Sequence, residues 1–594
     1  MSLWRRLWYT AMAHPSRAVE AMYWFATGRR QRARNRLRLG IADSAHAYRL
    51  WQEEAEPPRM NAAQIAAQVA QWDQPPRISV IVHLRDRLRA AAITRMLAAL
   101  AVQSYPHWEL VLVCARGIQT PRLAHAPRIV LTAEHTNSPA RAIAIAMQAA
   151  SGDHILPLAE EAQLTSDALF HLAAAMRDNS GACVAYADQD ECAEGAKRQA
   201  YWFKPQWNPD LFLAQDYLSG ICLIRADAVR AHLPLHPARA DAAVYALLLA
   251  ITGGKGAQVL HVPRVLAHLP SAQARRGVSA QDAPARAAAV ARHVMNAGGV
   301  ARIGPHGTVG VEWPLPDPPP LVSILIPTRD GLDLLRLCIT GVLHHTDYPA
   351  IEVLIIDNGS VQADTLDWLD RITADPRVRV LRDDGPFNFA ALNNGAAAQA
   401  RGEYLCMLNN DIEVLEPGWL TALMRQAVRP HVGAVGARLL YEDGSVQHAG
   451  VTIGLGDAAG HAHRFERGDD PGYFARSHAQ HSVSAVTAAC LVVARHKFAA
   501  VGGFDAEHLA VAFNDVDLCL KLRAAGWTNI YEPAAELIHH ESKSRGRDTS
   551  PQHIARYRAE LAVLQRRWGT VDHVDPLHHP QLDRMSERYR LKLP

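Results

Sequence analysis

The stretch that decides the fold is Leu321-Val-Ser-Ile-Leu-Ile-Pro-Thr-Arg-Asp330, an apolar run that ends abruptly in polar residues. Two later stretches have the same design, Ile351-Glu-Val-Leu-Ile-Ile-Asp-Asn-Gly-Ser360 and Tyr404-Leu-Cys-Met-Leu-Asn-Asn-Asp411. Their apolar cores have the length of buried strands, and helical stretches separate them. Strands that alternate with helices predict an α/β domain with a mostly parallel, Rossmann-like sheet.

Polar side chains follow each of these strands, at the edge of a parallel sheet where ligands bind. They are Pro327, Thr328, Arg329 and Asp330 after the first strand, Asp357 and Asn358 after the second, and Asn409, Asn410 and Asp411 after the third. Aspartate and asparagine also favour turns and helix caps, and Asp357 alone fits that interpretation equally well. Three strands that end in acids or amides at one edge favour a polar, anionic pocket.

The same succession occurs earlier in the chain, which indicates a duplicated domain. Residues 76–86 (PRISVIVHLRD) resemble residues 320–330, and residues 152–158 (GDHILPL) resemble residues 402–408. A length of 594 residues also exceeds the ~250–300 residues of one hydrophobic core. We therefore expect five segments. They are a basic, aromatic helical extension (1–74), a first α/β domain (75–300), a proline-rich linker (301–320), a second α/β domain (321–550) and a helical tail (551–594).

Composition limits the compartment and the class of protein. Hydrophobic residues make up 49% and charged residues 20% of the chain, which is typical of a globular protein. The eight cysteines include no C-x-x-C pair, so we expect free thiols and a reducing environment. We find no apolar run long enough to span a bilayer and no signal peptide. The sequence therefore predicts a cytoplasmic protein.

The first 40 residues carry an unusual charge and aromatic content. Residues 1–39 contain nine arginines and one acid, Glu20, with Trp4, Trp8, Tyr23 and Trp24 among the arginines. This pattern is typical of a helix on an anionic membrane surface, at the cytoplasmic face of the inner membrane. A solvated helical arm explains it equally well. Nucleic acid is not expected as a partner, because no recognised binding fold follows the basic stretch.

The three strand-end motifs, together with G-G-F-D (502–505), F-N-D-V-D-L-C-L-K-L-R (513–523) and A-E-L-I-H-H-E-S (535–542), resemble the inverting GT-A glycosyltransferases of family 2. The resemblance covers about 225 residues in the right order. Within the family it is strongest to rhamnosyltransferase-like enzymes of bacterial surface polysaccharide assembly. It implies two tandem GT-A domains and transfer of a sugar from a nucleotide diphosphate to a hydroxyl of a glycan or lipid-linked acceptor.

The resemblance also implies the roles of the strand-end residues. Residues 327–330, Asp357, Asn358, Asn409 and Asn410 would bind the nucleotide sugar, with Asp357 accepting from the pyrimidine ring. Asn409-Asn410-Asp411 takes the place of the family's DXD metal motif, and its first acid is an amide here. Asp411 is then the main carboxylate ligand of Mg²⁺ or Mn²⁺, which offsets charge on the leaving diphosphate. One of His539 and His540 would assist; we prefer His539.

Asp515 would be the general base, because an inverting displacement needs one carboxylate beside the acceptor hydroxyl. The alternative is that Asp515 and Asp517 cap the helix that follows them. Gly502, Gly503, Phe504, Asp505 and Asn514 would shape the acceptor side, although a plain glycine turn also fits the first four. Arg545 and Arg547 could close over the diphosphate or lie in a solvated basic loop.

The first copy has lost the matching side chains. Leu84 stands at the position of Thr328, Cys114 at that of Asp357, and Ala159-Glu160-Glu161 at that of residues 409–411. We therefore expect a degenerate domain that scaffolds or binds acceptor glycan. The alternative for the whole chain is a non-catalytic glycan-binding or assembly protein built on two inactive folds. The sequence assigns no chemistry to the tail, and we interpret His461-Ala-His463 as a solvent-facing loop.

Overall fold

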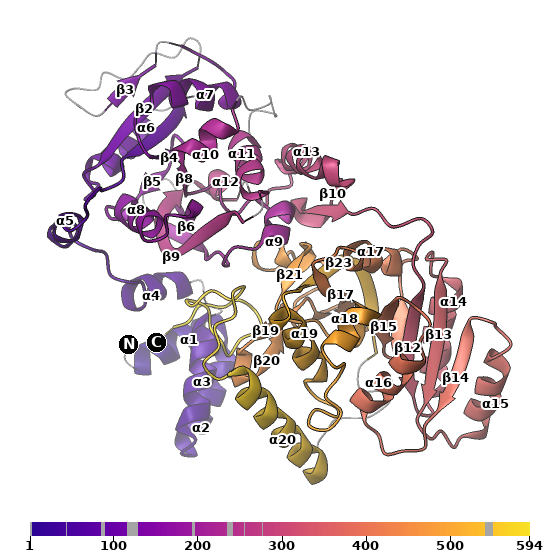
Figure 1. Cartoon of the computed structure of the whole chain (residues 1–594). Coiled ribbons are helices and arrows are strands. Elements are labelled where there is room, and N and C mark those ends of the chain that lie inside the picture. Colours follow the sequence, from indigo (N-terminus) through magenta and orange to yellow (C-terminus); the bar gives the residue numbers. More distant parts are fainter. Residues whose placement is uncertain are drawn as a thin grey trace. The chain divides into compact units, whose positions relative to one another are not determined.

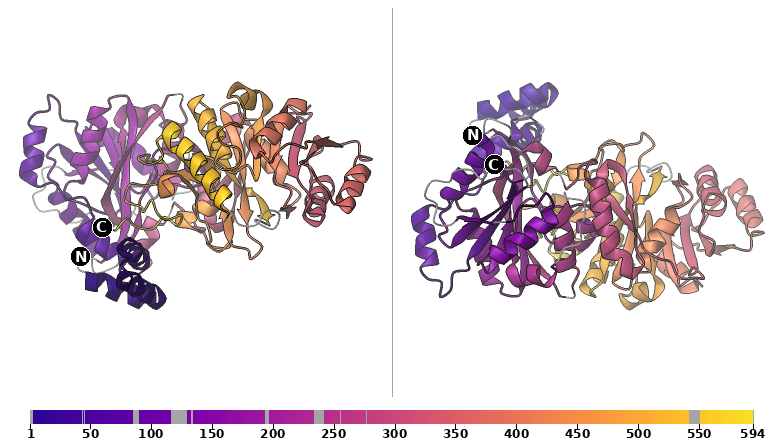
Figure 2. Two further views of the ribbon diagram at one scale, coloured as in Figure 1. Left: turned by 90° about the horizontal axis from the view of Figure 1, so that it is seen from below. Right: turned by 90° about the horizontal axis from the view of Figure 1, so that it is seen from above.

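The computed structural model describes residues 3–42, 44, 46–84, 90–115, 129–132, 134–192, 197–233, 242–254, 256–275, 277–540 and 550–593. The chain divides into two compact units. Unit 1 holds residues 1–293, 579–583 and 590–594, and unit 2 holds residues 294–578 and 584–589. In Figures 1 and 2 the two ends of the chain, both in unit 1, lie side by side. Arg38 and Asp583 form an ion pair of 3.4 Å there.

Unit 1 begins with five helices and continues as an α/β domain. The helices of the extension are α1 (Leu3–Ala13), α2 (Pro15–Ala26), α3 (Arg30–Ala42), α4 (Ala47–Glu54) and α5 (Ala62–Val69). The strands that follow are β1 (Ile78–Leu84), β2 (Trp108–Cys114), β3 (Ile129–Leu131), β4 (His154–Pro157), β5 (Gln163–Leu164), β6 (Ala182–Cys192), β7 (Arg198–Trp202), β8 (Cys222–Arg225) and β9 (Gln258–Leu269). The helices among and after them are α6 (Ala90–Ala101), α7 (Pro139–Ala149), α8 (Ala168–Asp178), α9 (Pro209–Ala214), α10 (Ala226–Ala231), α11 (Ala243–Thr252), α12 (Ser271–Ala274) and α13 (Ala283–Val294).

Unit 2 repeats this architecture (Figure 1). Its strands are β10 (Val300–Ile303), β11 (Val309–Glu312), β12 (Val322–Thr328), β13 (Ile351–Asp357), β14 (Val378–Arg382), β15 (Tyr404–Leu408), β16 (Ile412–Val414), β17 (Val432–Leu440), β18 (Val446–His448), β19 (Val451–Ile453), β20 (Ala459–His461), β21 (His481–Val483), β22 (Cys490–Ala494) and β23 (Thr528–His539). Its helices are α14 (Leu332–His344), α15 (Ala363–Ile372), α16 (Phe389–Gln399), α17 (Trp419–Ala427), α18 (Arg495–Ala500), α19 (Asn514–Ala524) and α20 (Pro551–Trp568).

The two main sheets have the same strand order, which supports the predicted duplication. The order is β3-β2-β1-β4-β8-β6-β9-β5 in unit 1 and β14-β13-β12-β15-β22-β17-β23-β16 in unit 2. The first half of each sheet is parallel, whereas β8 and β22 run antiparallel to both of their neighbours. Each sheet is therefore mixed, with parallel pairing in its first half and again between β6 and β9 in unit 1 and between β17 and β23 in unit 2. Apolar runs alone do not specify strand direction.

Both sheets are held by the same side-chain contacts. Ser79 Oγ donates to Glu109 at 2.6 Å and accepts from Gly152 N at 2.9 Å. In unit 2, Ser323 Oγ donates to Glu352 at 2.5 Å and accepts from Gly402 N at 2.8 Å. Both glycines are required, because a Cβ on either would lie 2.6 Å from the serine hydroxyl. The stretches that recur in the two halves of the sequence therefore also form the same hydrogen bonds.

The strands of unit 2 are buried on both faces. Val322, Ile324 and Ile326 of β12 pack in one core with α14 and α17, and Leu325 packs in the other with α16 and α19. This alternation follows from the two-residue period of a strand. Covered faces leave the strand ends as the accessible edge of the sheet.

The expectation about the connecting segment between the two α/β domains needs correction. The predicted linker, 301–320, begins within an antiparallel hairpin of β10 and β11, in which Ile303 pairs with Val309. Prolines follow only after that hairpin, so the extended region is shorter than the sequence suggested. All eight cysteines are free, as expected.

Candidate active site

The first two strand ends of unit 2 meet in register. Thr328 pairs with Asp357 across the parallel strands β12 and β13. The Asp357 carboxylate accepts from Ser360 N at 3.0 Å and pairs with the guanidinium of Arg382. Arg382 ends β14 and was not anticipated from the sequence, because its strand has no recognised motif. Asp357 is buried, and its contact with the Arg382 guanidinium fixes the orientation of its carboxylate.

The neighbouring residues of this edge mostly shape the backbone. Asp330 accepts from Val361 N and Gln362 N at 3.0 Å each, and it has a positive φ of 51°. The amide of Asn358 donates to the carbonyls of Asp383 and Gly385 at 3.1 and 2.9 Å. Pro327 is buried at the end of its strand, whereas Arg329 is exposed. Asp330 and Asn358 are therefore committed to turn-forming contacts with the backbone at this edge.

The third strand end joins the first. The amide of Asn410 donates to Thr328 Oγ1 at 3.0 Å, and Asn409 N donates to the Ala489 carbonyl at 3.0 Å. The adjacent Ala488 N donates to the Asp515 carboxylate at 3.1 Å. Consecutive residues of one segment thus link Asn409 to Asp515. The predicted nucleotide, metal and base residues are brought to one edge of the sheet.

Asp411 lies in the turn just before β16, next to His539 at the end of β23, because Ile412 pairs with His539. His539 Nε2 is 3.1 Å from Asp411 Oδ1 and 3.1 Å from the Asn409 amide. The other ring nitrogen, Nδ1, is 2.6 Å from Gln447 Oε1. Since a carbonyl oxygen only accepts, Nδ1 carries the proton and Nε2 presents its lone pair. Gln447 was missed by the sequence analysis, because it lies far along the chain on β18.

The lone pair of His539 and a buried carboxylate oxygen of Asp411 therefore face each other. Asp411 Oδ1 has no hydrogen-bond donor among the described residues. A ring nitrogen and a carboxylate oxygen 3.1 Å apart are the kinds of ligand that bind a divalent cation, so this pair is a candidate metal site. His540 does not join them, because its ring contacts Glu413 at 2.9 Å and also Glu442.

Asp515 lies in the first turn of α19 and is half-buried. Burial raises the pKa of its carboxyl, and the Ala488 and Val516 backbone N–H groups partly oppose that shift. A raised pKa brings a carboxylate closer to the range in which it removes a proton effectively. Phe513, just before the helix, has a positive φ of 62°, a conformation that a bulky side chain rarely adopts. Asn514 is buried and donates to the Val511 carbonyl at 3.0 Å.

Asp517 is fully buried and is bound from α20. Its Oδ1 accepts from Arg567 at 2.8 Å and from the Trp568 indole at 2.9 Å. Arg567 also binds Asp505 at 2.6 Å, and this guanidinium contributes to holding the pKa of Asp505 well below its ordinary value despite desolvation. The tail, to which the sequence assigned no chemistry, therefore supports the loop and helix that carry Asp515.

The Gly-Gly-Phe-Asp segment is a turn with a buried centre. Gly502 and Gly503 have φ of 76° and 62°, and a Cβ on Gly503 would lie 2.7 Å from Asn394 Oδ1. Asn394 accepts from Phe504 N at 3.0 Å, and the Phe504 ring is buried. These residues hold the loop in place through their backbone and packing, which leaves its predicted acceptor-side role a prediction. Arg545 and Arg547 lie outside the described residues.

Two histidines that the sequence placed in a solvent-facing loop are not exposed. His461 lies 2.8 Å from His448, nitrogen to nitrogen, and burial lowers the pKa of His461 to about 3. His463 is buried and contacts Glu466 at 2.8 Å. The interpretation was wrong because β20 pairs with β19 and carries the loop inward.

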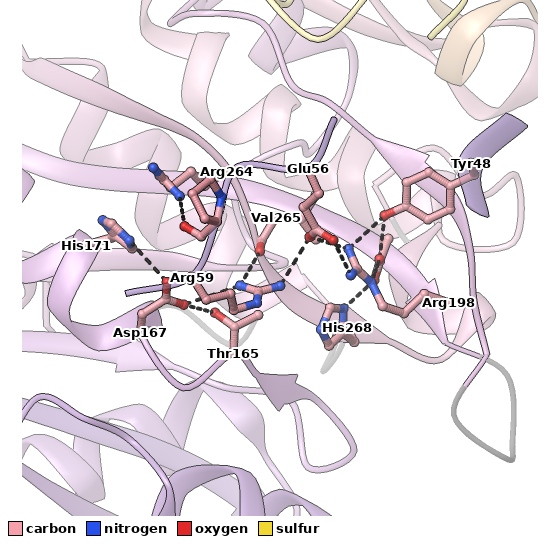
Figure 3. A network of polar contacts seen from close by, with 12 residues as sticks. Tyr48, Glu56, Arg59, Thr165, Asp167, His171, Arg198, Arg264, Val265 and His268 are labelled. Carbon is pink, nitrogen blue, oxygen red and sulfur yellow. Dashed lines mark hydrogen bonds and ion pairs between the residues drawn. The ribbon is translucent and has the colours of Figure 1, made fainter. Parts of the chain in front are cut away.

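In unit 1 the equivalent positions have other uses. Leu84 pairs with Cys114 in the register of Thr328 and Asp357, so no carboxylate is present there. His268 corresponds to His539 on the last long strand, and its Nδ1 lies 2.6 Å from Asp190. Asp190 in turn binds Tyr48 at 2.6 Å and Arg198, and Arg198 binds Glu56 (Figure 3). The extension is thus fastened to this unit through the surroundings of His268.

A compact acid–histidine cluster lies elsewhere in unit 1. The ligand atoms of Asp188, His261 and His579 are within 4.8 Å of one another. Gln581 N donates to His579 Nδ1 at 3.1 Å, and His579 Nε2 lies 2.9 Å from Asp188 Oδ2. Neither His579 Nε2 nor Asp188 Oδ2 has a hydrogen-bond partner among the described residues. This cluster of unit 1 therefore also offers ligand atoms for a cation, apart from Asp411 and His539 of unit 2.

Residues 323–480 match the family model described as glycosyl transferase family 2. This part of the chain, within unit 2, is therefore similar to that family. The chain is 39% identical over 539 residues to a protein of Sinorhizobium fredii, covering 88% of this chain and 59% of that protein. It is 34% identical over 551 residues to the O-antigen biosynthesis protein RfbC of Myxococcus xanthus, covering 90% of this chain and 42% of RfbC. The chain thus spans about half the length of these relatives.

A third relative matches only part of the chain. The N-acetylglucosaminyl-diphospho-decaprenol L-rhamnosyltransferase of Mycobacterium tuberculosis is 29% identical over 247 residues, covering 36% of this chain and 75% of that protein. The family and the two equivalent mixed sheets establish a glycosyltransferase architecture of tandem GT-A type. Within the described ranges, none of the helices combines the length and apolar character needed to cross a bilayer.

Proposed function

We propose that unit 2 transfers a sugar, with inversion, from a nucleotide diphosphate to a hydroxyl of a bacterial glycan or lipid-linked acceptor. The observation that carries this proposal is the unprotonated Nε2 of His539 facing the orphaned Asp411 carboxylate oxygen. Mg²⁺ or Mn²⁺ bound there would offset negative charge on the leaving diphosphate. Thr328, Asp357 and Asn410, held in one hydrogen-bonded edge, would bind the nucleotide.

Asp515 is our candidate for the general base. Its carboxylate is held by two backbone N–H groups and its pKa is raised by burial. In the proposed reaction it takes the proton of the acceptor hydroxyl as that oxygen attacks the anomeric carbon. Asp517 does not compete for this role, since Arg567 and Trp568 bind it.

We propose rhamnose as the donor sugar, because the names of two relatives support it. One relative is named a rhamnosyltransferase, and another is named for O-antigen biosynthesis. A lipid-linked acceptor would place the reaction at the cytoplasmic face of the inner membrane. We propose that residues 1–40 contact that membrane peripherally.

Unit 1 would serve as a scaffold or a binding domain for acceptor glycan. Leu84 and Cys114 provide no carboxylate for a nucleotide base, and His268 is held by Asp190. The same losses favour the alternative that the whole chain is a non-catalytic assembly protein. The intact set around Asp411, His539 and Asp515 argues against that alternative for unit 2.

The proposal is tested by thermal shift of the full chain with Mn²⁺ and a panel of dTDP-, UDP- and GDP-sugars. A ligand that binds only the folded state raises the melting temperature, and a tighter ligand raises it more at the same concentration. We expect one donor to stabilise the chain only when the metal is present. Transfer from that donor to a lipid-linked acceptor then separates the enzyme from the assembly protein. No stabilisation by any nucleotide sugar would contradict the proposal.

A further inference from the structure

The first three helices form a packed group with a distinct inner side. Thr10 Oγ1 of α1 donates to the Leu37 carbonyl of α3 at 3.2 Å. Gly40 is required at this crossing, because a Cβ there would lie 2.4 Å from the Thr10 methyl group. Buried residues of all three helices line the inner side: Tyr9, Thr10, Ala18, Ala21, Ala33 and Leu37. The opposite sides of α1 and α2 are therefore their outer faces.

The outer face of α1 is an apolar stripe. Trp4, Trp8 and Met12 follow one another at four-residue spacing, so they share one side of the helix. They are 79%, 56% and 59% exposed. Single exposed apolar residues need no explanation, but two indoles and a thioether in line do.

The outer face of α2 has the same character. Val19, Met22 and Tyr23 are spaced three and four residues apart and are 61%, 48% and 59% exposed. Ala21, on the other side, and Ala18, at the edge of this face, are buried. We call these six residues, Trp4, Trp8, Met12, Val19, Met22 and Tyr23, the α1–α2 stripe. Two successive helices with outward apolar faces indicate a surface that is covered by a partner.

The charge around the stripe identifies the chemistry of that partner. Residues 1–39 contain nine arginines and one acid, and that acid, Glu20, is paired with Arg36 at 2.9 Å. Arg29, Arg30 and Arg34 are exposed. A second copy would bring the same positive face against itself, and the aliphatic Met12 and Val19 gain nothing from a phosphodiester backbone. Indole, phenol and guanidinium groups together suit the interface of an anionic bilayer.

We propose that the α1–α2 stripe inserts into the headgroup region of an anionic lipid bilayer, with the neighbouring arginines bound to lipid phosphates. This assigns residues to the peripheral membrane contact proposed above and rests on that proposal. The stripe inserts only as deep as its side chains, because the inner faces of α1 and α2 remain packed on α3 and on each other. Binding combines apolar burial with charge attraction, and salt weakens the second of these.

The test is sedimentation of the full chain with vesicles of phosphatidylcholine alone, or of equal parts phosphatidylcholine and phosphatidylglycerol. We expect binding to the anionic vesicles only, decreasing as salt rises. Trp4→Ala/Trp8→Ala/Met12→Ala should weaken binding at least about tenfold, because two interfacial indoles are lost. Arg29→Glu/Arg30→Glu/Arg34→Glu should abolish the preference for anionic lipid. Met295→Ala/Ile303→Ala is the matched control, since these residues of unit 2 are 65% and 53% exposed.

Three outcomes would overturn the proposal. They are no binding to anionic vesicles, equal binding to both vesicle types, and equal losses for the stripe and control variants. A dimer by light scattering that the stripe variant abolishes would assign the surface to a second copy instead. Melting temperatures with and without nucleotide on the same samples separate a failure of donor binding in unit 2 from a failure of vesicle binding.

Discussion

At the residue scale, the tautomer of His539 is the detail on which metal binding depends. The Gln447 side chain has its amide nitrogen 3.4 Å from the His539 carbonyl, which places its oxygen on the imidazole side. Nδ1 must then donate, and Nε2 presents its lone pair toward Asp411 and the Asn409 amide. A neighbouring residue far away in sequence thus selects which histidine nitrogen is available.

We expect His539→Ala to weaken Mn²⁺ affinity in the presence of nucleotide by at least about tenfold, because one of two protein ligands is lost. His540→Ala is the matched control, since His540 is bound by Glu413 and Glu442 instead. Calorimetric titration with Mn²⁺ in the presence of nucleotide measures the metal affinity of both variants. A larger loss in the His540 variant would reverse the assignment.

We expect Asp515→Asn to lower kcat by about 10³-fold, because an amide cannot take the acceptor proton. Metal-dependent nucleotide binding should remain nearly intact.

In the wild type, the active form of Asp515 is the carboxylate, so activity should rise with pH. The midpoint of that rise should lie above the ordinary pKa of aspartate, since burial raises the pKa of Asp515. Rates with saturating donor, measured from acidic to neutral pH, test this; full activity in the variant would remove Asp515 as the base.

At the element scale, α20 determines whether α19 presents Asp515 correctly. Arg567 bridges Asp505 and Asp517, which lie before and within α19. Glu560 of the same helix accepts from Val511 N and Ala512 N at 3.1 and 2.8 Å. Both ends of the short segment that leads into α19 are therefore fixed by one helix of the tail.

We expect Arg567→Ala to lower the free energy of unfolding by about 1–2 kcal/mol, because the buried Asp517 loses a charged hydrogen-bond donor. Arg566→Ala is the control, since Arg566 is its exposed neighbour. Urea unfolding measures the difference between the two variants. An equal effect of both substitutions would mean that the Arg567 bridge contributes nothing specific.

That bridge also predicts a response to acid. The folded-state pKa of Asp505 is depressed, so its contribution to stability is present above the unfolded pKa of aspartate and is lost as pH falls. The difference between wild type and Arg567→Ala should therefore shrink when unfolding is repeated under acidic conditions.

At the scale of the whole molecule, two equivalent sheets are combined with one intact set of polar strand ends. We expect one nucleotide per chain in a calorimetric titration with Mn²⁺, because Leu84 and Cys114 replace Thr328 and Asp357 in unit 1. Asp357→Ala should abolish that binding, whereas Cys114→Ala at the matching position should leave it unchanged. A stoichiometry of two would show that unit 1 retains a nucleotide site.

The sequence alone predicted both α/β domains, because buried strands and the serine–glutamate–glycine contacts that hold them recur as visible motifs. It also indicated the strand-end residues, since their spacing after apolar runs is local. The antiparallel strands, the hairpin at residues 300–312 and the inward position of His461 and His463 were not predicted. Each depends on pairing between distant segments, which short-range periodicity does not encode.

The sequence by itself thus determined which residues end the strands and that the first copy lacks the matching acids. Only the tertiary structure decided that His539 rather than His540 faces Asp411, that Arg382 pairs with Asp357, and that Arg567 supports the helix of Asp515. The physical reason is the same in each case. Ionic and hydrogen-bonded partners are selected by distance in space, and every one of these partners comes from a different element of the fold.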